Sequence, residues 1–379
     1  MQDQFNIQEM VVTGIQVSGP RKLFTVSYKV SPWRFVEIRV SRLIFFIALL
    51  FFSTVSAIGQ DLHFSHFFEA PLVRNPSLAG IFAGDFRAQM VYRNQWASVT
   101  TPYQTGSLNA EYKFHVGRGD DFMTAGMQIL WDKAGTVALS TNHLLPALNF
   151  HKSLSAEHNT YLSLGFMGGL VDRRLDRAKV TTNNQYDGFS YNGSLPDGEN
   201  FVSGYSYFDA SVGMSLNSAI GQNDKSQQNN FFIGIAYHHF NKPVNSFYST
   251  LQHLPKWVVS GGLRTTMGDY SYMTIQADFS EQGPFREGIA GATFSRKVGD
   301  DADPQYTISF GGYLRWKDAF IPVMKLDYNP FSIGFSYDMN ISALRTASLG
   351  QGGFEFSLTY MAFFDRDNSS RDKVRCPRF

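Results

Sequence analysis

The residues of this chain that could carry chemistry are a few histidines, because their spacing could allow them to bind a metal ion. His63 and His66 lie three residues apart, ahead of the first clear strand pattern. Imidazoles at short spacing become zinc ligands when cysteines or carboxylates complete the set. No such cluster accompanies this pair in the sequence, so we expect no metal site and no resident cofactor.

The remaining candidates give no catalytic pair. His238 and His239 are adjacent in a predicted strand, where successive side chains point to opposite faces, so they could not chelate together. Ser140 and His143 have opposite parity in another strand, which argues against a nucleophile and its base. The chain also lacks Gly-x-Ser-x-Gly, a phosphate-binding glycine loop and His-Glu-x-x-His. We therefore predict that the protein is not an enzyme.

The elements that position these residues are strands, because apolar and polar residues alternate from Phe86 onward. Across 331–339, for example, Phe, Ile, Phe, Tyr and Met share one face, while Ser, Gly, Ser and Asp share the other. A large apolar face and a small polar face predict an all-β fold, a transmembrane antiparallel outer-membrane β-barrel with lipid outside and a polar lumen. We predict about 14 strands of about ten residues, at 86–93, 105–114, 123–131, 139–151, 160–171, 208–216, 230–239, 256–267, 271–280, 286–297, 305–315, 321–328, 331–339 and 353–364. Pro146 and Pro322 make the fourth and twelfth the least regular, since proline donates no ladder hydrogen bond.

Composition agrees with this fold. Aromatic residues make up 15% of the 379 and glycines number 33, while charged residues are only 17%, against about 25% in soluble domains. A formal net charge of +1, with Arg and Lys spread along the chain, gives no sign of nucleic-acid binding. The single cysteine, Cys376, excludes an internal disulfide.

The front of the chain predicts export. Arg39 and Arg42 precede an apolar run at 43–52, which is the length of a signal-peptide core and too short to span a bilayer. We assign 39–60 to a signal peptide, with an uncleaved N-terminal anchor as the alternative. Residues 1–38 are expected to be an upstream extension outside the fold.

With an even number of strands, the first strand begins and the last strand ends on the same side of the membrane, the periplasm. The loops after odd-numbered strands then lie outside the cell. The longest connection, 172–207, follows the fifth strand and is therefore predicted to be external. Its aromatic residues are candidate contacts for a partner: Tyr186, Phe189, Tyr191 and Phe201. The charged tail at 365–379 is expected to reach the periplasm.

Residues 61–85, between the signal and the first strand, are the best candidate for a plug. They carry too many apolar groups for a free tail, and Pro71 and Pro76 deny them regular structure. A peripheral strand that caps the rim is the alternative. Alternation also turns six charges toward the lumen, where they either bind a plug or partner or simply fill and wet the interior: Arg87, Arg93, Glu111, Arg264, Arg315 and Glu355.

Several short motifs resemble the PorP/SprF family of type IX secretion outer-membrane proteins. Those before the first strand are His63-Phe64-Ser65, Ala70-Pro71-Leu72 and Asn75-Pro76-Ser77-Leu78-Ala79-Gly80, and Tyr92-Arg93-Asn94-Gln95-Trp96 ends that strand. Gly352-Gly353-Phe354-Glu355 and Cys376-Pro377-Arg378-Phe379 continue the likeness, which covers residues 60 to 379. Asn75-Pro76-Ser77 is also similar to the Asn-Pro-Ala signature of FadL-like barrels, which implies an inward hatch.

The resemblance implies a non-enzymatic component of type IX secretion and gliding motility. Its expected partners are secreted cargo with a type-B C-terminal targeting domain, the periplasmic and outer-membrane secretion machinery, and membrane lipid. A FadL-like channel for small hydrophobic molecules is the main alternative. An enzyme embedded in the barrel would need a nucleophile and a base on one face, which the sequence does not supply.

Overall fold

The computed structural model describes residues 61–364, apart from 98–99, 118, 200–201, 222–228, 248–249, 300–303 and 344. The predicted extension, signal peptide and C-terminal tail, together with Phe201 and Cys376, lie outside the described residues. Among those described, no helix has the length and apolar character needed to span a bilayer.

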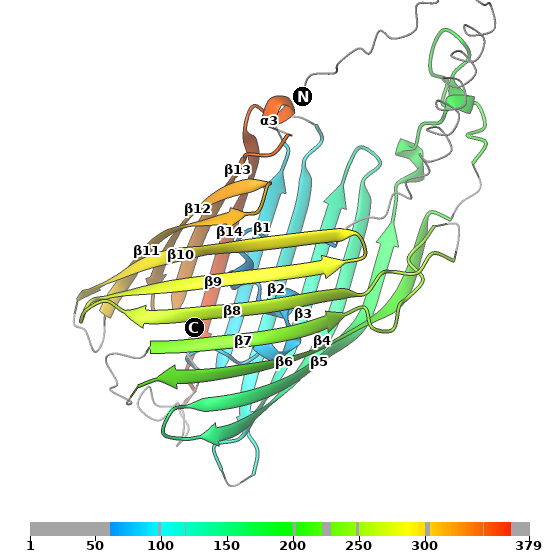
Figure 1. The fold of residues 1–379 in the computed structure, drawn as a ribbon. Coiled ribbons are helices and arrows are strands. Elements are labelled where there is room, and N and C mark those ends of the chain that lie inside the picture. The colour runs from blue at the N-terminus through cyan, green and yellow to red at the C-terminus, as the bar shows by residue number, and fades with distance from the viewer. Residues whose placement is uncertain are drawn as a thin grey trace, which may run out of the picture. The chain divides into compact units, whose positions relative to one another are not determined.

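Fourteen antiparallel strands form a closed barrel, in which each pairs with its sequence neighbours and the last pairs with the first (Figure 1). This confirms the predicted architecture and strand number. The strands are β1 Phe86–Gln95, β2 Tyr103–His115, β3 Phe122–Ala134, β4 Leu139–Ser155, β5 Thr160–Arg174, β6 Gly204–Ile220, β7 Asn229–His238, β8 Lys256–Thr266, β9 Ser271–Gln282, β10 Phe285–Gly299, β11 Pro304–Arg315, β12 Ala319–Tyr328, β13 Phe331–Asn340 and β14 Gln351–Ala362.

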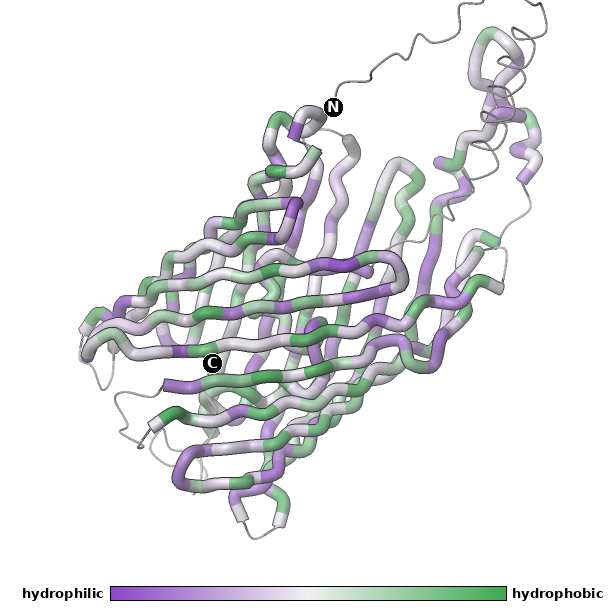
Figure 2. Tube along the Cα trace, in the orientation of Figure 1, coloured by the Kyte–Doolittle hydropathy of each residue, from purple (hydrophilic) through white to green (hydrophobic). Residues whose placement is uncertain are grey.

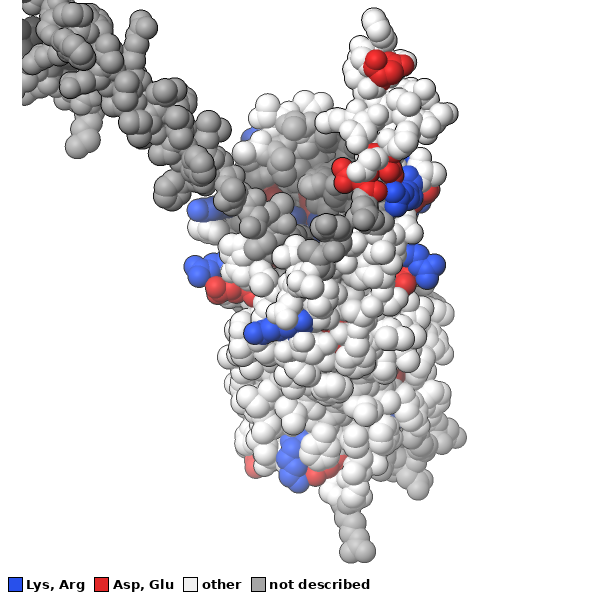
Figure 3. All heavy atoms as spheres, turned by 90° about the vertical axis from the view of Figure 1, so that its right-hand side faces the viewer, with Lys and Arg blue, Asp and Glu red and all other residues white. Residues whose placement is uncertain are grey.

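The two faces of the wall differ as the alternation predicts. In β13, exposed and buried residues alternate along the whole strand, with Phe335 on the outside and Ser336 on the inside. Figure 2 shows apolar and polar positions interleaved along the strands. On the face shown in Figure 3, a band without charged residues crosses the middle of the wall, and charges lie toward both ends. An apolar band of this extent is stable only when lipid covers it.

The two strands that contain proline are present, and each loses pairing locally. Pairing of β4 with β5 is continuous up to Leu144 and resumes at Ala147, which leaves out Pro146 and its neighbour. Pairing of β12 with β13 likewise stops at Phe320 and resumes at Val323. Proline has no N–H to donate, so the barrel tolerates it as a gap in one ladder.

Several strands extend beyond their predicted bounds. β6 begins at Gly204 rather than Phe208 and ends at Ile220 rather than Leu216, and β4 continues to Ser155 rather than His151. Burial still alternates through these ends, so strand pairing continues past the residues whose apolar and polar types mark the strand in the sequence. The connection after β5 is therefore shorter than predicted, at 175–203.

Candidate functional site

Residues 61–85, which we call the N-terminal segment, run through the barrel from one end to the other. Asp61 N donates a hydrogen bond of 2.9 Å to Gln282 Oε1 at the end of β9. Lys113 Nζ, near the end of β2, donates one of 2.7 Å to the Phe82 carbonyl. Odd and even strands run in opposite directions, so these two strand ends lie at opposite ends of the barrel.

The N-terminal segment folds as three single turns that its prolines and one asparagine define: η1 Phe67–Glu69, α2 Pro71–Arg74 and η2 Pro76–Leu78. Pro71 and Pro76 begin their helices, where a missing N–H costs nothing. Asn75 caps the last turn, because its Oδ1 accepts hydrogen bonds from Ser77 N at 2.8 Å and Ser77 Oγ at 2.7 Å. The segment forms no strand, which argues against the rim-capping alternative.

Three glycines on neighbouring strands allow this turn to lie against the wall. Gly165 of β5 and Gly213 of β6 are register partners, and Gly234 is on β7. A Cβ at Gly165 would lie 2.5 Å from Ser77 N, and one at Gly234 would lie 2.9 Å from Asn75 Nδ2. A Cβ at Gly213 would collide with Asn75 Oδ1. We call these three residues the glycine seat.

Hydrogen bonds hold the turn on the glycine seat. Asn75 Nδ2 donates to the Ile235 carbonyl at 3.2 Å. Asn149 Nδ2, on β4, donates to the Ser77 carbonyl at 2.7 Å and to the Ala79 carbonyl at 2.8 Å. Asn75 and Ser77 are completely buried, so these bonds satisfy polar groups that water cannot reach.

A charged network holds the segment near the other barrel end. The Glu355 carboxylate accepts hydrogen bonds from Ser65 N at 2.7 Å and from His66 N at 2.6 Å. Asp338 accepts from the Ser65 hydroxyl and from Arg315, both at 2.8 Å. The strands therefore supply carboxylates to the backbone N–H groups of an irregular segment, which would otherwise be unsatisfied inside the barrel.

The other predicted lumen charges also lie inside the barrel, and most of them contact the segment. Arg93 reaches the His63 carbonyl and pairs with Asp338. Glu111 accepts from Gly80 N at 2.8 Å, and Arg87 pairs with Glu111 at 2.8 Å. The sixth charge, Arg264, lies over the Tyr272 ring, 3.7 Å from its centroid. The hypothesis that these charges bind a plug describes the contacts better than interior filling alone.

Two further ion pairs fix the middle of the segment. The Arg74 guanidinium donates two hydrogen bonds to Asp278 of β9. Glu69 lies 2.7 Å from Lys325 Nζ and also accepts a hydrogen bond from Gln89. Burial alone would raise the pKa of Glu69, but the charge of Lys325 and these hydrogen bonds outweigh it and lower the pKa to about 2.

Residues 56–360 match the protein family described as type IX secretion system membrane protein PorP/SprF. The chain belongs to the PorP/SprF family. It is therefore an outer-membrane β-barrel, and the recognition made from the sequence motifs is confirmed. No curated protein matches the chain.

Solved structures give only distant likenesses to this PorP/SprF-family barrel. The toluene transporter TbuX of Ralstonia pickettii is 8% identical and covers 78% of this chain and 93% of its own, with a TM-score of 0.45. The CymD monoaromatic hydrocarbon channel is 10% identical, covers 82% and 96%, and has a TM-score of 0.43. The NalP translocator domain of Neisseria meningitidis is 10% identical, covers 78% and 95%, and has a TM-score of 0.36. At these scores the likenesses carry no functional argument.

The motif at the end of β1 divides between the two faces of the PorP/SprF-family wall. Arg93 is buried and binds the N-terminal segment, as described above. Tyr92 packs against Phe354 of β14, with ring centroids 6.3 Å apart, and Trp96 packs against Tyr103 at 5.0 Å. The expectation that Trp96 anchors the barrel at headgroup level stays a prediction.

A cluster of histidines and carboxylates holds Asp61, where the described chain begins. His239 Nδ1 lies 2.8 Å from Asp209, and its Nε2 contacts Asp61. The prediction that His238 and His239 point to opposite faces is wrong, since both are buried. β7 ends at His238, and His239 has a φ of 55°, so strand alternation no longer applies to it.

Opposite charges fix the protonation of this cluster. Burial would lower the pKa of His239, but the charges and hydrogen bonds of Asp61 and Asp209 outweigh it and raise the pKa to about 10. Burial would raise the pKa of Asp61, yet the attraction of His239 and His253 holds it well below its usual value. At neutral pH the carboxylate and the imidazolium are therefore both charged.

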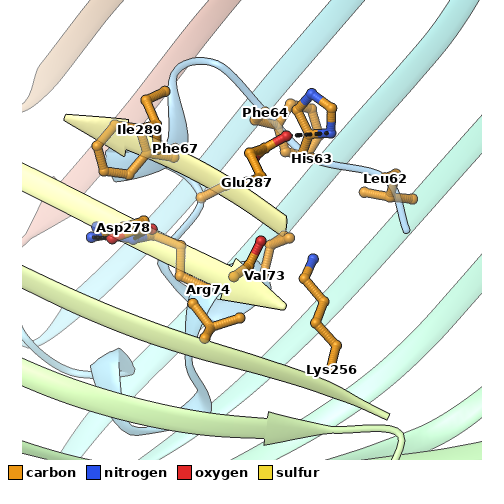
Figure 4. Close-up of a pocket in the computed structure, with 13 residues that line it drawn as sticks. Leu62, His63, Phe64, Phe67, Val73, Arg74, Lys256, Asp278, Glu287 and Ile289 are labelled. Carbon is orange, nitrogen blue, oxygen red and sulfur yellow. Dashed lines mark hydrogen bonds and ion pairs between the residues drawn. The ribbon is translucent and has the colours of Figure 1, made fainter. Parts of the chain in front are cut away.

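A small cavity lies between the N-terminal segment and strands β8 to β10 (Figure 4). Its volume is about 50 Å³, and its lining includes Phe64, Lys256 and Glu287. Pockets for small organic ligands usually measure roughly 300–1,000 Å³. This cavity therefore has room for ordered water and not for a hydrocarbon substrate.

His63 and His66 have different partners in the structure. His63 Nδ1 lies 3.5 Å from Glu287, while His66 packs edge-on against Phe68, with ring centroids 4.5 Å apart. The Ser140 hydroxyl donates to the Arg174 carbonyl.

A different serine–histidine pair, which has no signal in the sequence, lies inside the barrel. Ser163 Oγ lies 2.7 Å from His151 Nδ1. Both residues are completely buried beneath Gly80, so no substrate can reach them. The pair therefore fits a packed interior better than a catalytic site.

The aromatic residues of the loop after β5 are available to a partner. Phe189 is 95% exposed, and Tyr186 and Tyr191 are 57% and 50% exposed. The two tyrosines form an isolated bridge that ties the base of this small loop. The structure therefore gives these side chains no role in the barrel interior.

Proposed function

We propose that this protein is a non-enzymatic component of type IX secretion that recognises exported proteins at its external loops, with its own lumen closed. The barrel interior carries the proposal. The N-terminal segment runs along the lumen and is held there by buried ion pairs and hydrogen bonds, which supports a closed interior. Recognition is then left to the loops and rim.

The loop after β5 is the proposed contact for cargo that carries a type-B C-terminal targeting domain. Exposed aromatic side chains are frequent anchors of protein interfaces, and removing one such anchor costs about 2 kcal/mol or more of binding. Phe189 is the leading candidate, because its ring is almost fully exposed and contributes nothing visible to the fold. We propose a role in gliding motility on the ground of the same family membership.

A gene deletion complemented with variants tests the proposal. We expect deletion to abolish surface display of type-B cargo, and Phe189→Ala to reduce it while the barrel remains at normal abundance. Leu251→Ala is a matched control, since Leu251 is also exposed, at 69%, in the loop after β7. Normal cargo display in the deletion strain, together with lost uptake of a small hydrophobic molecule, would favour the channel alternative.

A further inference from the structure

Three metal-binding side chains meet where the N-terminal segment begins. Asp61, His239 and His253 each offer one donor atom, and these atoms lie within 4.8 Å of one another. His253 Nε2 is 2.8 Å from Asp61 Oδ1, and His239 Nε2 contacts Asp61 Oδ2. Asp61 belongs to the segment, whereas both histidines belong to the connection between β7 and β8.

The far side of each imidazole is also occupied. His239 Nδ1 lies 2.8 Å from Asp209 Oδ1, and His253 Nδ1 lies 3.1 Å from the Asn245 side-chain amide. The rings are parallel within 12°, with centroids 4.0 Å apart. The two Nε2 atoms contact the two different oxygens of Asp61, and a hydrogen-bond partner on Nδ1 of each ring is typical of histidines that bind metal.

We propose that Asp61, His239 and His253 bind a divalent transition-metal ion of the zinc class, which fastens the start of the N-terminal segment to the barrel rim. Two imidazoles and a carboxylate are a known zinc donor set. The Gln282 side chain presents its amide nitrogen to His253 Nε2 at 3.1 Å, while its oxygen accepts from Asp61 N, so a water molecule would complete the tetrahedral set. Donors around tetrahedral zinc are about 3.4 Å apart, so the 2.8 Å separation of His253 Nε2 and Asp61 Oδ1 must widen by about 0.6 Å and the shorter His239 contact by more. The parallel rings must also tilt so that both Nε2 atoms face one ion.

The proton balance sets a specific requirement at Asn245. An imidazole that binds a metal ion through Nε2 has no proton on Nε2 and carries its one N–H on Nδ1. Ligation therefore releases the Nε2 proton of His239 to solvent and leaves His253 with an Nδ1–H that faces Asn245. That new N–H needs an acceptor, but the Asn245 oxygen is held by Arg173 at 2.7 Å and by Tyr205. The Asn245 amide must therefore turn when metal binds.

Asn245→Asp removes this requirement, because a carboxylate can accept from Arg173, Tyr205 and His253 together. The metal site therefore predicts a variant that binds more tightly than the native protein. A cluster held only by hydrogen bonds predicts no metal in either protein. A variant that failed to fold could not bind zinc more tightly, so a gain in affinity cannot be produced by misfolding.

The experiment uses the full exported chain in detergent, stripped with a chelator and titrated with Zn²⁺. Calorimetry measures affinity, and elemental mass spectrometry measures bound zinc after desalting. We expect one equivalent in the native protein, at least tenfold weaker binding in His253→Gln and tighter binding in Asn245→Asp. His151→Gln is the control, since His151 is a buried histidine near the other barrel end and should leave affinity unchanged. Absence of stoichiometric zinc in the native protein, or equal uptake by His253→Gln, overturns the proposal.

Discussion

Replacing Gly213 with alanine tests whether the Asn75–Ser77 turn depends on the glycine seat. The added methyl would overlap Asn75 Oδ1 and lie 3.2 Å from Pro76 Cδ. Asn75 cannot swing aside without losing the cap of its own turn and its bond to the Ile235 carbonyl. The turn must therefore lift from the wall and weaken the bonds that Asn149 makes to it.

The cost follows from the bonds involved. Overpacking of this kind costs roughly 1–3 kcal/mol, and each weakened hydrogen bond adds about 1 kcal/mol. Replacing a strand glycine returns about 0.5–1 kcal/mol. A net cost of about 2–3 kcal/mol corresponds to a roughly 30- to 150-fold rise in local opening, at tenfold per 1.4 kcal/mol.

Hydrogen exchange measures this opening directly. We expect faster exchange for the amides of Ser77, Leu78 and Ala79, with little change in the strands, because opening is local. Gly126→Ala is the matched control. Gly126 is a strand glycine beside Leu72 of the same segment, and its added methyl would meet neighbours at an ordinary 3.5–3.7 Å. Unchanged protection in Gly213→Ala, or an equal rise in both variants, would refute close approach as the reason for glycine.

Three other perturbations address the segment and the loop. Glu355→Gln removes one of the two carboxylates that pair with Arg93, since Asp338 remains, and it removes the charge that accepts from Ser65 N and His66 N. We therefore expect a loss of about 1.5–3 kcal/mol, seen as faster protease cleavage within 61–70. Because the pKa of Glu69 is lowered to about 2, its stabilisation is present above about pH 4.5 and is lost as pH falls toward 2. That stabilisation is about 3 kcal/mol, and Glu69→Gln should flatten the acid-unfolding curve in detergent; an unchanged curve would contradict the pKa. Phe189→Ala should leave the thermal unfolding temperature within about 1 °C, since surface changes cost under 0.5 kcal/mol, and a larger drop would mean that the ring packs in the fold.

The sequence predicts the wall far better than it predicts the interior. Every strand has lipid on one face and the lumen on the other, so apolar and polar residues must alternate along it. The type of a residue such as Phe335 or Ser336 therefore indicates which face it occupies. The glycine seat is different, because Gly165, Gly213 and Gly234 matter only as a group on three strands. No pattern within any one of these strands marks its glycine as a contact for the turn.

The sequence does not predict the cluster around Asp61, for a related reason. Its members lie far apart along the chain, and His239 turns inward only because the backbone leaves the strand conformation after His238. A positive φ at a histidine has no local sequence signal. The lumen charges were predictable individually from parity, but their partners were not, because many of those partners are backbone N–H groups of the segment.

Those partners also bear on how the barrel works. Glu355 and Glu111 accept hydrogen bonds from backbone N–H groups of the segment. Asp278 pairs with Arg74, the arginine of the segment. Removing the segment would leave these carboxylates facing a lumen without the donors they now have. Breaking these ion pairs and hydrogen bonds together has a free-energy cost, which favours a lumen occupied by the segment. That cost opposes passage of a protein through the lumen and does not affect binding at the loops.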